Sequence, residues 1–354
     1  MRFDRDVPLA PLTTLRLGGK AARVVTVEQE LDVPEALAEA EASGVPAFVL
    51  GGGSNLVVAD EGFGGLVVRM ASRGVNIERE GGLARVTLAA GEPWDAFVTR
   101  AVDDGFSGVE CLAGIPGLVG ATPMQNVGAY GQEVKDTVAS VRAYDRDARA
   151  FVDLSPEVCA FGYRTSRLKT TGRYVVTAVS FVLPVRAEST PVRYPELARA
   201  LGVREGGTAP LARVRDAVIA LRRTKGMVLD PTDSETVSAG SFFMNPIVDA
   251  VTLARVEEGA RGITGADGPI TPPRYPAGDG AWKVPAAWLI ERAGFTRGYG
   301  NEHVHVSTKH TLALVNGRGT TRDLLALAGE IVRGVEKTFG VTLVPEPVML
   351  GCCL

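Results

Sequence analysis

At 354 residues the chain is too long for one hydrophobic core, so two or three domains are expected. Its 38 basic and 41 acidic residues give a formal net charge of −3, which argues against a nucleic-acid-binding protein, because that class needs a large surplus of Lys and Arg. The four cysteines form no CxxC pair and no apolar run approaches the ~20 residues of a membrane span, so we expect a soluble cytoplasmic protein with reduced thiols and no membrane partner.

The first predicted elements are a strand, a helix and a second strand. Residues 24–27 favour a strand, and residues 31–42 have the amphipathic spacing of a helix that ends at Gly44. Residues 47–50 are wholly apolar, which predicts a strand buried on both faces of a sheet. This strand runs directly into Gly51, so a glycine-rich turn lies at the carboxyl end of a strand, where α/β folds usually bind ligands.

Short elements follow along the chain. Glycine and polar residues separate three short strands that predict an antiparallel region: residues 65–69, 75–78 and 83–88. Residues 93–104 predict a helix with Pro93 in its first turn. Two more strands, at 141–144 and 174–183, flank a short helix.

From Pro210 onward helices and strands are mixed. One helix face carries Leu211, Val214, Val218 and Leu221, and this helix ends in the basic cluster Arg222, Arg223 and Lys225. Further helices are predicted at 250–259, 285–293 and 323–339, the last capped by Gly340. Residues 303–307 and 311–316 predict a strand pair, and a final strand is predicted through 345–347.

The turn Gly51–Asn55 fits no generic phosphate motif. The Rossmann pattern needs a third glycine where the chain has Leu56, and the sequence contains neither a P-loop nor a G-x-S-x-G elbow. The turn is therefore a phosphate loop of another kind or an ordinary turn. Three successive glycines free the backbone to approach a ligand, and Ser54 and Asn55 add donors, so we favour an anion-binding turn.

A second glycine-rich segment, residues 114–131, combines five glycines and two prolines with Ile115, Met124 and Tyr130. Apolar side chains of this kind favour burial, unlike those of a plain linker. A buried irregular backbone needs partners for its polar groups, and a bound cofactor can supply them. The segment is therefore predicted to line a ligand.

Together with other short motifs, these two segments resemble the UDP-N-acetylenolpyruvoylglucosamine reductase family, the FAD-dependent reductases of peptidoglycan precursor synthesis. The resemblance spans nearly the whole chain through residues 13–19, 51–55, 115–117, 125–131, 161–166, 239–246 and 345–347. It implies an α+β fold in which a two-subdomain FAD-binding unit of the vanillyl-alcohol-oxidase-like type precedes a smaller α+β substrate-binding domain. The expected boundaries are residues 1–67 and 68–208 for the two subdomains and 209–354 for the substrate-binding domain, whose final strand carries Glu346.

The resemblance also implies a reaction. NADPH reduces noncovalently bound FAD, and flavin N5 then delivers hydride to the enolpyruvyl group of UDP-N-acetylglucosamine enolpyruvate, giving UDP-N-acetylmuramate. Negative charge builds up beside a carboxylate in this step, so the site must stabilise that charge more strongly in the transition state than before it. A positioned acid must then protonate the neighbouring carbon.

Three residues match the catalytic positions of the family. Arg164 matches the arginine that faces the substrate carboxylate, and its guanidinium stays charged at any working pH. Ser241 matches the proton donor, and Glu346 matches the C-terminal glutamate, which can stabilise the enolate-like intermediate only if it carries or shares a proton. Without the resemblance, these residues would be interpreted as a surface ion pair, a turn residue and a strand-end carboxylate.

Ligand contacts are carried over in the same way. The FAD contacts implied are Gly51, Gly52, Gly53, Ser54, Asn55, Ile115, Pro116, Gly117, Gly120, Ala121, Thr122, Gln125, Asn126, Gly128 and Tyr130. The substrate contacts implied are Tyr194, Lys225, Asn245, Tyr275 and Lys283. Tyr194 indicates the branch of the family with a tyrosine-bearing loop over a small nucleotide-sugar substrate, and no obligate protein partner is inferred.

The chain departs from the family where Pro347-Val348-Met349 follows the glutamate, since many members have Val-Arg there; the terminal Cys352-Cys353 has no counterpart that we can interpret.

Three other functions remain open. A covalent-flavin oxidase of the same superfamily would need an attachment residue, for which Cys111 is the one candidate. A zinc site would have to use His303, His305 and His310, which lack a recognisable ligand spacing, and we expect no metal. A non-catalytic sensor of nucleotide sugars is disfavoured by the three catalytic matches, and the sequence does not distinguish NADPH from NADH.

Overall fold

The computed structural model describes residues 1–261, 263–265, 268–269 and 271–354. These residues form two compact units. Unit 1 comprises Met1–Val7, Ala21–Gly53 and Gly64–Val228, and unit 2 comprises Pro8–Lys20, Ser54–Phe63 and Leu229–Leu354. Within this described part of the chain, no helix is both long enough and apolar enough to cross a bilayer.

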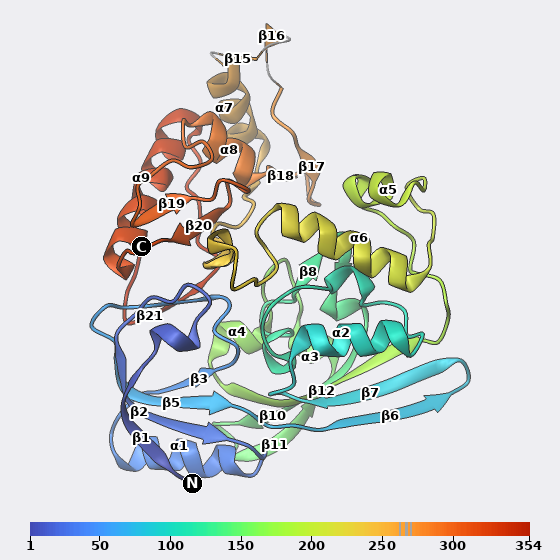
Figure 1. Cartoon of the computed structure of the whole chain (residues 1–354), viewed down its shortest axis with the longest axis vertical. Coiled ribbons are helices and arrows are strands. Elements are labelled where there is room, and N and C mark those ends of the chain that lie inside the picture. The colour runs from blue at the N-terminus through green and yellow to red at the C-terminus, as the bar shows by residue number, and fades with distance from the viewer. Residues whose placement is uncertain (262, 266–267, 270) are drawn as a thin grey trace. The chain divides into compact units, whose positions relative to one another are not determined.

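The first sheet of unit 1 has four strands in the order β1-β2-β5-β3 (Figure 1). Its elements are β1 (Phe3–Pro8), β2 (Lys20–Val27), helix α1 (Asp32–Ala42), β3 (Ala47–Leu50) and β5 (Phe63–Met70). The helix buries Val33, Ala36, Leu37 and Ala40, whose spacing of three and four places them on one face. This confirms the predicted strand, helix and strand.

Strand β3 is one of the two edge strands of this sheet and runs parallel to β5. Only Leu50 of its four residues is buried, so the predicted burial on both faces is wrong. The apolar run gave no sign of the edge position, where a strand has a neighbour on one side only. Residues 65–69 lie in β5, and their assignment to the antiparallel region is also wrong.

The second sheet of unit 1 is antiparallel throughout, in the order β11-β10-β12-β7-β6. Its strands are β6 (Val75–Glu80), β7 (Leu83–Ala89), β10 (Val138–Asp145), β11 (Ala150–Leu154) and β12 (Tyr174–Pro184). The strands predicted at 75–78, 83–88, 141–144 and 174–183 are confirmed, whereas β11 was missed between the last two.

Helices and short turns complete unit 1. They are α2 (Trp94–Asp103), η2 (Glu110–Leu112), η3 (Val119–Ala121), the hairpin β8 (Gly128–Ala129) and β9 (Gln132–Glu133), η4 (Val134–Asp136), α3 (Pro156–Cys159), α4 (Arg167–Thr171), α5 (Pro195–Leu201) and α6 (Leu211–Thr224). Helix α2 confirms the helix predicted at 93–104 and buries Phe97, Val98 and Ala101, although Pro93 is its N-cap and not part of its first turn. The ring of Phe97 stacks on Phe181 of β12, with 5.2 Å between ring centroids, which joins the helix to the sheet.

Unit 2 is built around helix α9 (Thr321–Phe339) and small sheets. Its other elements are η1 (Ala10–Leu12), β4 (Leu56–Val58), η5 (Ser234–Thr236), β13 (Ser238–Ser241), β14 (Ile247–Val248), α7 (Ala250–Arg261), β15 (Thr264–Gly265), β16 (Gly268–Pro269), β17 (Tyr275–Pro276), β18 (Trp282–Lys283), α8 (Ala286–Arg292), β19 (Val304–Val306), β20 (Ala313–Asn316) and β21 (Val348–Leu350). The predicted helices and the antiparallel pairing of β19 with β20 are confirmed. Gly340 ends α9 in the left-handed conformation, with φ of 65°, as its position after the last apolar residue indicated.

The turn after β10 predicts a pH-dependent contribution to stability. Asp145 is almost fully buried and accepts two hydrogen bonds from Arg173, at 2.7 and 2.6 Å, which lower the pKa of Asp145 to about 2. Because the pKa of Asp145 is lower in the folded protein, its carboxylate stabilises the fold at pH values above ~4, the pKa of an unfolded aspartate. This stabilisation disappears as the pH falls towards 2. Asp145→Asn should therefore lower the urea midpoint at pH 6 and approach the wild-type midpoint as the pH falls from 4 towards 2.

Equilibrium urea unfolding at several pH values measures this difference. Asp153→Asn is the matched control, because its carboxylate lies in the same sheet, faces Arg142 at 3.4 Å and is 65% exposed. The control should change the midpoint little at any of these pH values. A destabilisation by Asp145→Asn that stays constant from pH 6 to pH 2.5 would contradict the assignment.

Candidate active site

The first glycine-rich turn leaves strand β3 within unit 1. Gly53 is in the left-handed region, with φ of 62°, which glycine adopts without strain. A Cβ on Gly52 would lie 2.7 Å from Cα of Gly117, so no side chain fits between these two backbones. The structure thus brings the two glycine-rich segments of the sequence into direct contact.

The second segment is held by the connection between β7 and α2. The amide of Gly120 donates to the carbonyl of Ala90 and that of Val119 to Glu92, both at 2.9 Å, and the amide of Trp94 donates to Gly117 at 3.1 Å. These bonds fix an irregular backbone that would otherwise have unsatisfied groups.

The residues of this segment differ in how far they reach the surface. Several predicted FAD contacts are partly or fully exposed: Ile115, Pro116, Gly117, Ala121, Gln125, Gly128 and Tyr130. The other predicted contacts of this segment, Gly120, Thr122 and Asn126, are buried and hold the backbone of the loop in place. Gly120 packs on Ala90, and the hydroxyl of Thr122 donates to the carbonyl of Val119 at 2.8 Å.

Asn126 joins three parts of the loop and is 1% exposed. Its side-chain amide donates to the carboxylate of Glu133 at 2.9 Å and to the carbonyl of Gly162 at 3.1 Å, and it accepts from the amide of Lys135 at 3.0 Å. Because the nitrogen and the oxygen of this side-chain amide are already hydrogen-bonded, a ligand contact of Asn126 would be made by its backbone.

Arg164 lies against the hairpin formed by β8 and β9. Its guanidinium donates to the carbonyl of Gly128 at 2.9 Å, and its backbone has φ of 55°, which is uncommon for a residue other than glycine. Ser166 holds the same segment by donating to the carbonyl of Met124 at 2.6 Å. The predicted carboxylate-binding arginine is therefore positioned beside predicted FAD contacts, and its strained backbone is typical of functional sites.

Two of the predicted substrate residues gather around Tyr130. The ring of Tyr194 meets that of Tyr130 edge to face, with 5.3 Å between centroids, and Nζ of Lys225 lies 5.5 Å from the Tyr130 centroid. Lys225 also pairs with Glu196 at 2.5 Å. Burial raises the pKa of Tyr130 to about 12, so its hydroxyl stays protonated and able to donate a hydrogen bond.

Arg222 was not predicted as a site residue, although it lies in this group. It is 9% exposed, donates to the carbonyl of Met227 at 2.8 Å, and has no acceptor for its buried Nε in the described part of the chain. Burial lowers the pKa of Arg222 to about 10, which still leaves it charged at neutral pH, and it interacts electrostatically with Tyr130 and Arg164. A buried cation with an unused N–H is suited to an anionic ligand.

The sequence did hold a signal for Arg222. It lies four residues after Val218 on the buried face of α6, so helical spacing places it inward, unlike Arg223. From this basic cluster the resemblance indicates only Lys225 as a ligand contact.

In unit 2, Thr14 joins two predicted site segments. Its hydroxyl donates to the carbonyl of Ser238 at 2.7 Å and approaches that of Ser54 at 3.4 Å. Thr14 belongs to the motif at residues 13–19, for which the sequence predicts no separate role. It ties the end of the first glycine-rich turn to the strand that carries Ser241.

The backbone of Glu346 is hydrogen-bonded to Phe242 and to Asn55. Its amide donates to the carbonyl of Phe242 at 2.9 Å, and its carbonyl accepts from the side chain of Asn55 at 3.3 Å. Glu346 does not lie in a strand, so that prediction is wrong: β21 begins at Val348. Pro345 and Pro347 lack amide hydrogens, so a regular ladder cannot run through them.

Ser241 is placed by an irregularity in β13. This strand pairs with β20 at Ser238 and Ser241, with a register shift between them, and Gly240 has φ of 71°. The hydroxyl of Ser238 accepts from the amide of Gly240 at 3.2 Å. Bulges of this kind redirect a side chain and are common beside active sites.

The remaining substrate residues also lie in unit 2. Tyr275 on β17 and Lys283 on β18 are register partners, and the Tyr275 side chain is exposed. Asn245 accepts from the amide of Ala286 at 2.9 Å, so its side-chain oxygen caps the start of α8.

The histidines have separate partners. His305 pairs with Glu235 at 3.1 Å, His310 accepts from the amide of Leu312 at 3.0 Å, and His303 lies 3.4 Å from the carbonyl of Arg318. No group of three His, Cys, Asp or Glu residues suited to a metal occurs in the ranges described by the structure.

Cys111, the candidate for covalent flavin attachment, is 3% exposed in η2. Burial raises the pKa of the Cys111 thiol, which removes the thiolate that such chemistry requires.

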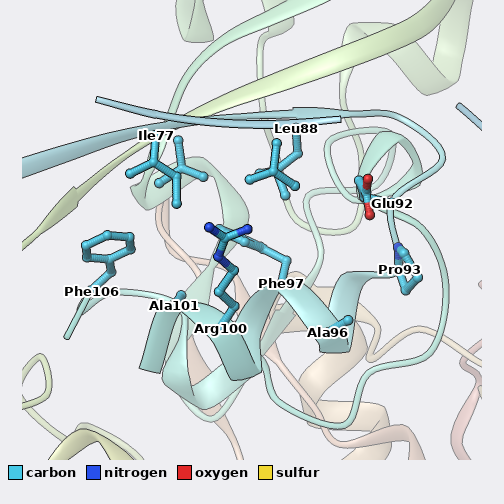
Figure 2. A pocket seen from close by; sticks show the side chains of 11 residues that line it. Ile77, Leu88, Glu92, Pro93, Ala96, Phe97, Arg100, Ala101 and Phe106 are labelled. Atoms are coloured by element: carbon cyan, nitrogen blue, oxygen red, sulfur yellow. The ribbon is translucent and has the colours of Figure 1, made fainter. Parts of the chain in front are cut away.

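A separate cavity of about 140 Å³ lies between α2 and the strands β6 and β7 (Figure 2). Arg100 extends from α2 towards Ile77 and Leu88, while the lining is mostly apolar. None of the predicted FAD or substrate residues is among the described residues that line this cavity. The glycine-rich turns, with the adjoining buried Arg222, suit a diphosphate cofactor far better than this cavity does.

Comparison with known proteins shows similarity over nearly the whole chain. Residues 230–350 match the family model for the C-terminal domain of UDP-N-acetylenolpyruvoylglucosamine reductase, and residues 21–152 match a model for an FAD binding domain. The chain is 55% identical to the UDP-N-acetylenolpyruvoylglucosamine reductase of Thermobifida fusca (strain YX), over 99% of both chains, and 53% identical to that of Streptomyces avermitilis, over 98% and 94%. The crystal structure of UDP-N-acetylenolpyruvylglucosamine reductase from Thermus caldophilus superposes with a TM-score of 0.66 at 27% identity, over 99% of both chains.

Proposed function

Because the chain belongs to the UDP-N-acetylenolpyruvoylglucosamine reductase family, an FAD-dependent class of oxidoreductases with this α+β fold, we propose that it reduces UDP-N-acetylglucosamine enolpyruvate to UDP-N-acetylmuramate with electrons from NADPH. The observation that carries this proposal is the pairing, in unit 2, of the segments that bear Ser241 and Glu346, with Asn55 bound to the same backbone. The product would enter peptidoglycan precursor synthesis.

A bound FAD would supply the redox chemistry, the transfer of hydride from the nicotinamide donor to the vinyl carbon of the substrate. The chain would hold the cofactor through backbone amides of its two glycine-rich turns. The contact of Gly52 with Gly117 supports this role, because it leaves the turns free of side chains where a diphosphate must approach closely. The buried guanidinium of Arg222, whose Nε–H has no acceptor among the described residues, adds a positive charge for an anionic group.

Arg164 would bind the substrate carboxylate and stabilise the charge that builds on it. Its guanidinium is already oriented by the carbonyl of Gly128, so little reorganisation is needed when the reaction begins. A fixed cation that meets charge as it develops lowers the barrier more than it stabilises the ground state.

Ser241 would protonate the substrate carbon next to the carboxylate. A hydroxyl is a weak acid, so its contribution depends on orientation, which the bulge at Gly240 provides. Glu346 would stabilise the enolate-like intermediate through a shared proton. Its backbone bond to Phe242, the neighbour of Ser241, supports a common role for the two side chains.

The nucleotide-sugar contacts proposed are Tyr194, Lys225, Asn245, Tyr275 and Lys283. The facing positions of Tyr275 and Lys283 on adjacent strands and the grouping of Tyr194 with Lys225 support this set. Residues 209–354 are proposed to recognise the substrate, after FAD-binding subdomains at 1–67 and 68–208. We place the reaction in the cytoplasm, where the four free cysteines would stay reduced.

Separating the two half-reactions tests the proposed function. Purified protein should carry flavin that NADPH bleaches anaerobically, and the enolpyruvyl substrate should then restore the oxidised spectrum. A parallel run with NADH determines the donor preference. Reduced flavin that keeps its spectrum after the enolpyruvyl nucleotide sugar is added, yet reoxidises with oxygen, would overturn the proposed substrate.

A further inference from the structure

A buried polar network surrounds Glu110 in unit 1 and has no part in the chemistry above. It contacts residues 187–196, the Tyr194 segment. Glu110 is fully buried, with 0% exposure, in η2. One carboxylate oxygen accepts from the amide of Gly108 at 2.6 Å, and the other accepts from the amide of Thr190 at 2.9 Å and from its hydroxyl at 3.4 Å. A buried carboxylate with three donors is strongly constrained in position.

The network closes on itself through the hairpin of β8 and β9. The side chain of Gln132 on β9 donates to the hydroxyl of Thr190 at 2.8 Å, and its oxygen accepts from the amide of Cys111 at 2.7 Å. Since Cys111 follows Glu110 directly, the bonds form a ring through η2, the hairpin and the segment before Tyr194. Gln132 is only 6% exposed, so water competes little for these bonds.

The same segment is fixed on its other side. The amide of Ser189 donates to the carbonyl of Ala209 at 2.9 Å, and the amide of Val192 donates to that of Gly207 at 2.8 Å. Beyond these bonds Tyr194 is exposed and meets the ring of Tyr130, which lies at the turn of the hairpin. Hydrogen bonds therefore hold the segment at residues 189–192, and Tyr194 follows directly after them.

We propose that Glu110, Thr190 and Gln132 are positioning residues that join the Tyr194 segment to the Tyr130 hairpin, so that the substrate-side and flavin-side tyrosines are ordered together. For its effect on catalysis this inference rests on the proposed function. The coupling itself is a property of the chain and can be measured without substrate.

Thr190→Val tests the link, because valine has the shape of threonine and removes only the hydroxyl that Gln132 and Glu110 share. Hydrogen exchange followed by mass spectrometry should show faster exchange in residues 187–196 and also in residues 126–134. Thr190→Ser, which keeps the hydroxyl, should restore protection in both. Thr87→Val is the matched control, since it removes a hydroxyl bonded to Ser180 at 2.8 Å elsewhere in unit 1, and it should alter neither region.

Steady-state kinetics supply the functional test. Thr190→Val should raise KM for the nucleotide sugar by roughly five- to thirty-fold, the range of one lost buried hydrogen bond, with a smaller change in flavin bleaching by NADPH. In a Tyr194→Phe background the same substitution should have a smaller effect on KM. Gln132→Leu breaks the link from the other side and should reproduce the exchange pattern.

Exchange that accelerates in residues 187–196 alone would overturn the coupling. An unchanged KM with a lowered melting temperature would leave only a structural role and would also overturn the proposal. If the wild-type protein fails to turn over the nucleotide sugar, the proposed function fails, while the exchange experiment still decides whether the two segments are coupled.

Discussion

Ser241→Ala is expected to lower the rate of substrate reduction by about 10²- to 10⁴-fold, the usual contribution of a positioned general acid. Binding of the nucleotide sugar should change little, because the hydroxyl acts on a carbon and carries no charge. Bleaching of the flavin by NADPH should keep its wild-type rate, since no proton from Ser241 is needed in that half-reaction.

Stopped-flow absorbance of the two half-reactions measures this separation. Ser180→Ala is a suitable control, because it deletes another half-buried strand hydroxyl, bonded to Thr87 in the second sheet of unit 1. Loss of flavin bleaching in Ser241→Ala would show a general disturbance of the site, and wild-type reoxidation by substrate would assign the proton to another group.

The backbone geometry around Ser241 makes the effect of Ser241→Ala straightforward to interpret. Ser241 pairs with Ala313 after a register shift, and Gly240 adopts the left-handed conformation that precedes it. Alanine at 241 retains this backbone, because only the hydroxyl is removed. A change of rate can therefore be attributed to the lost proton donor and not to a rearranged strand.

Elements with a strong internal period were predictable from the sequence. Helix α9 shows apolar residues at helical spacing from Leu324 to Phe339 with Gly340 as its cap, and each signal refers to the same local geometry. Strand β3 shows the limit of this reasoning. Its apolar run indicates burial but does not say whether it lies at the centre or the edge of a sheet, which depends on pairing partners distant in sequence.

The candidate site was likewise predictable from the sequence only in part. The glycine-rich turns were recognisable because their composition is unusual over a few residues. Arg222 was not predicted as a site residue: helical spacing places it on the buried face of α6, but a basic cluster ordinarily lies in solvent. Thr14 was missed as a link between Ser54 and Ser238 because its partners lie 40 and 224 residues away in the sequence.

Gly52→Ala is expected to weaken FAD binding by roughly 5- to 150-fold, which corresponds to the ~1–3 kcal/mol of a small overpacking change. The added Cβ would lie 2.7 Å from Cα of Gly117 and 3.2 Å from its carbonyl carbon. Both are backbone atoms, so the strain cannot be relieved by turning a side chain.

The second segment cannot simply move away, because Gly117 accepts from the amide of Trp94 and the adjoining residues bond to Ala90 and Glu92. The substitution should therefore displace the first turn, with the fold of unit 1 largely kept. The ratio of flavin to protein absorbance after purification, followed by titration of the apoprotein with FAD, measures the effect. Gly64→Ala is the matched control: no described atom lies within 4 Å of its added Cβ and its backbone is not left-handed, so it should bind FAD normally. Wild-type affinity in Gly52→Ala would mean that the close contact of the two turns has no part in holding the cofactor, and the diphosphate would then have to be assigned to other backbone groups.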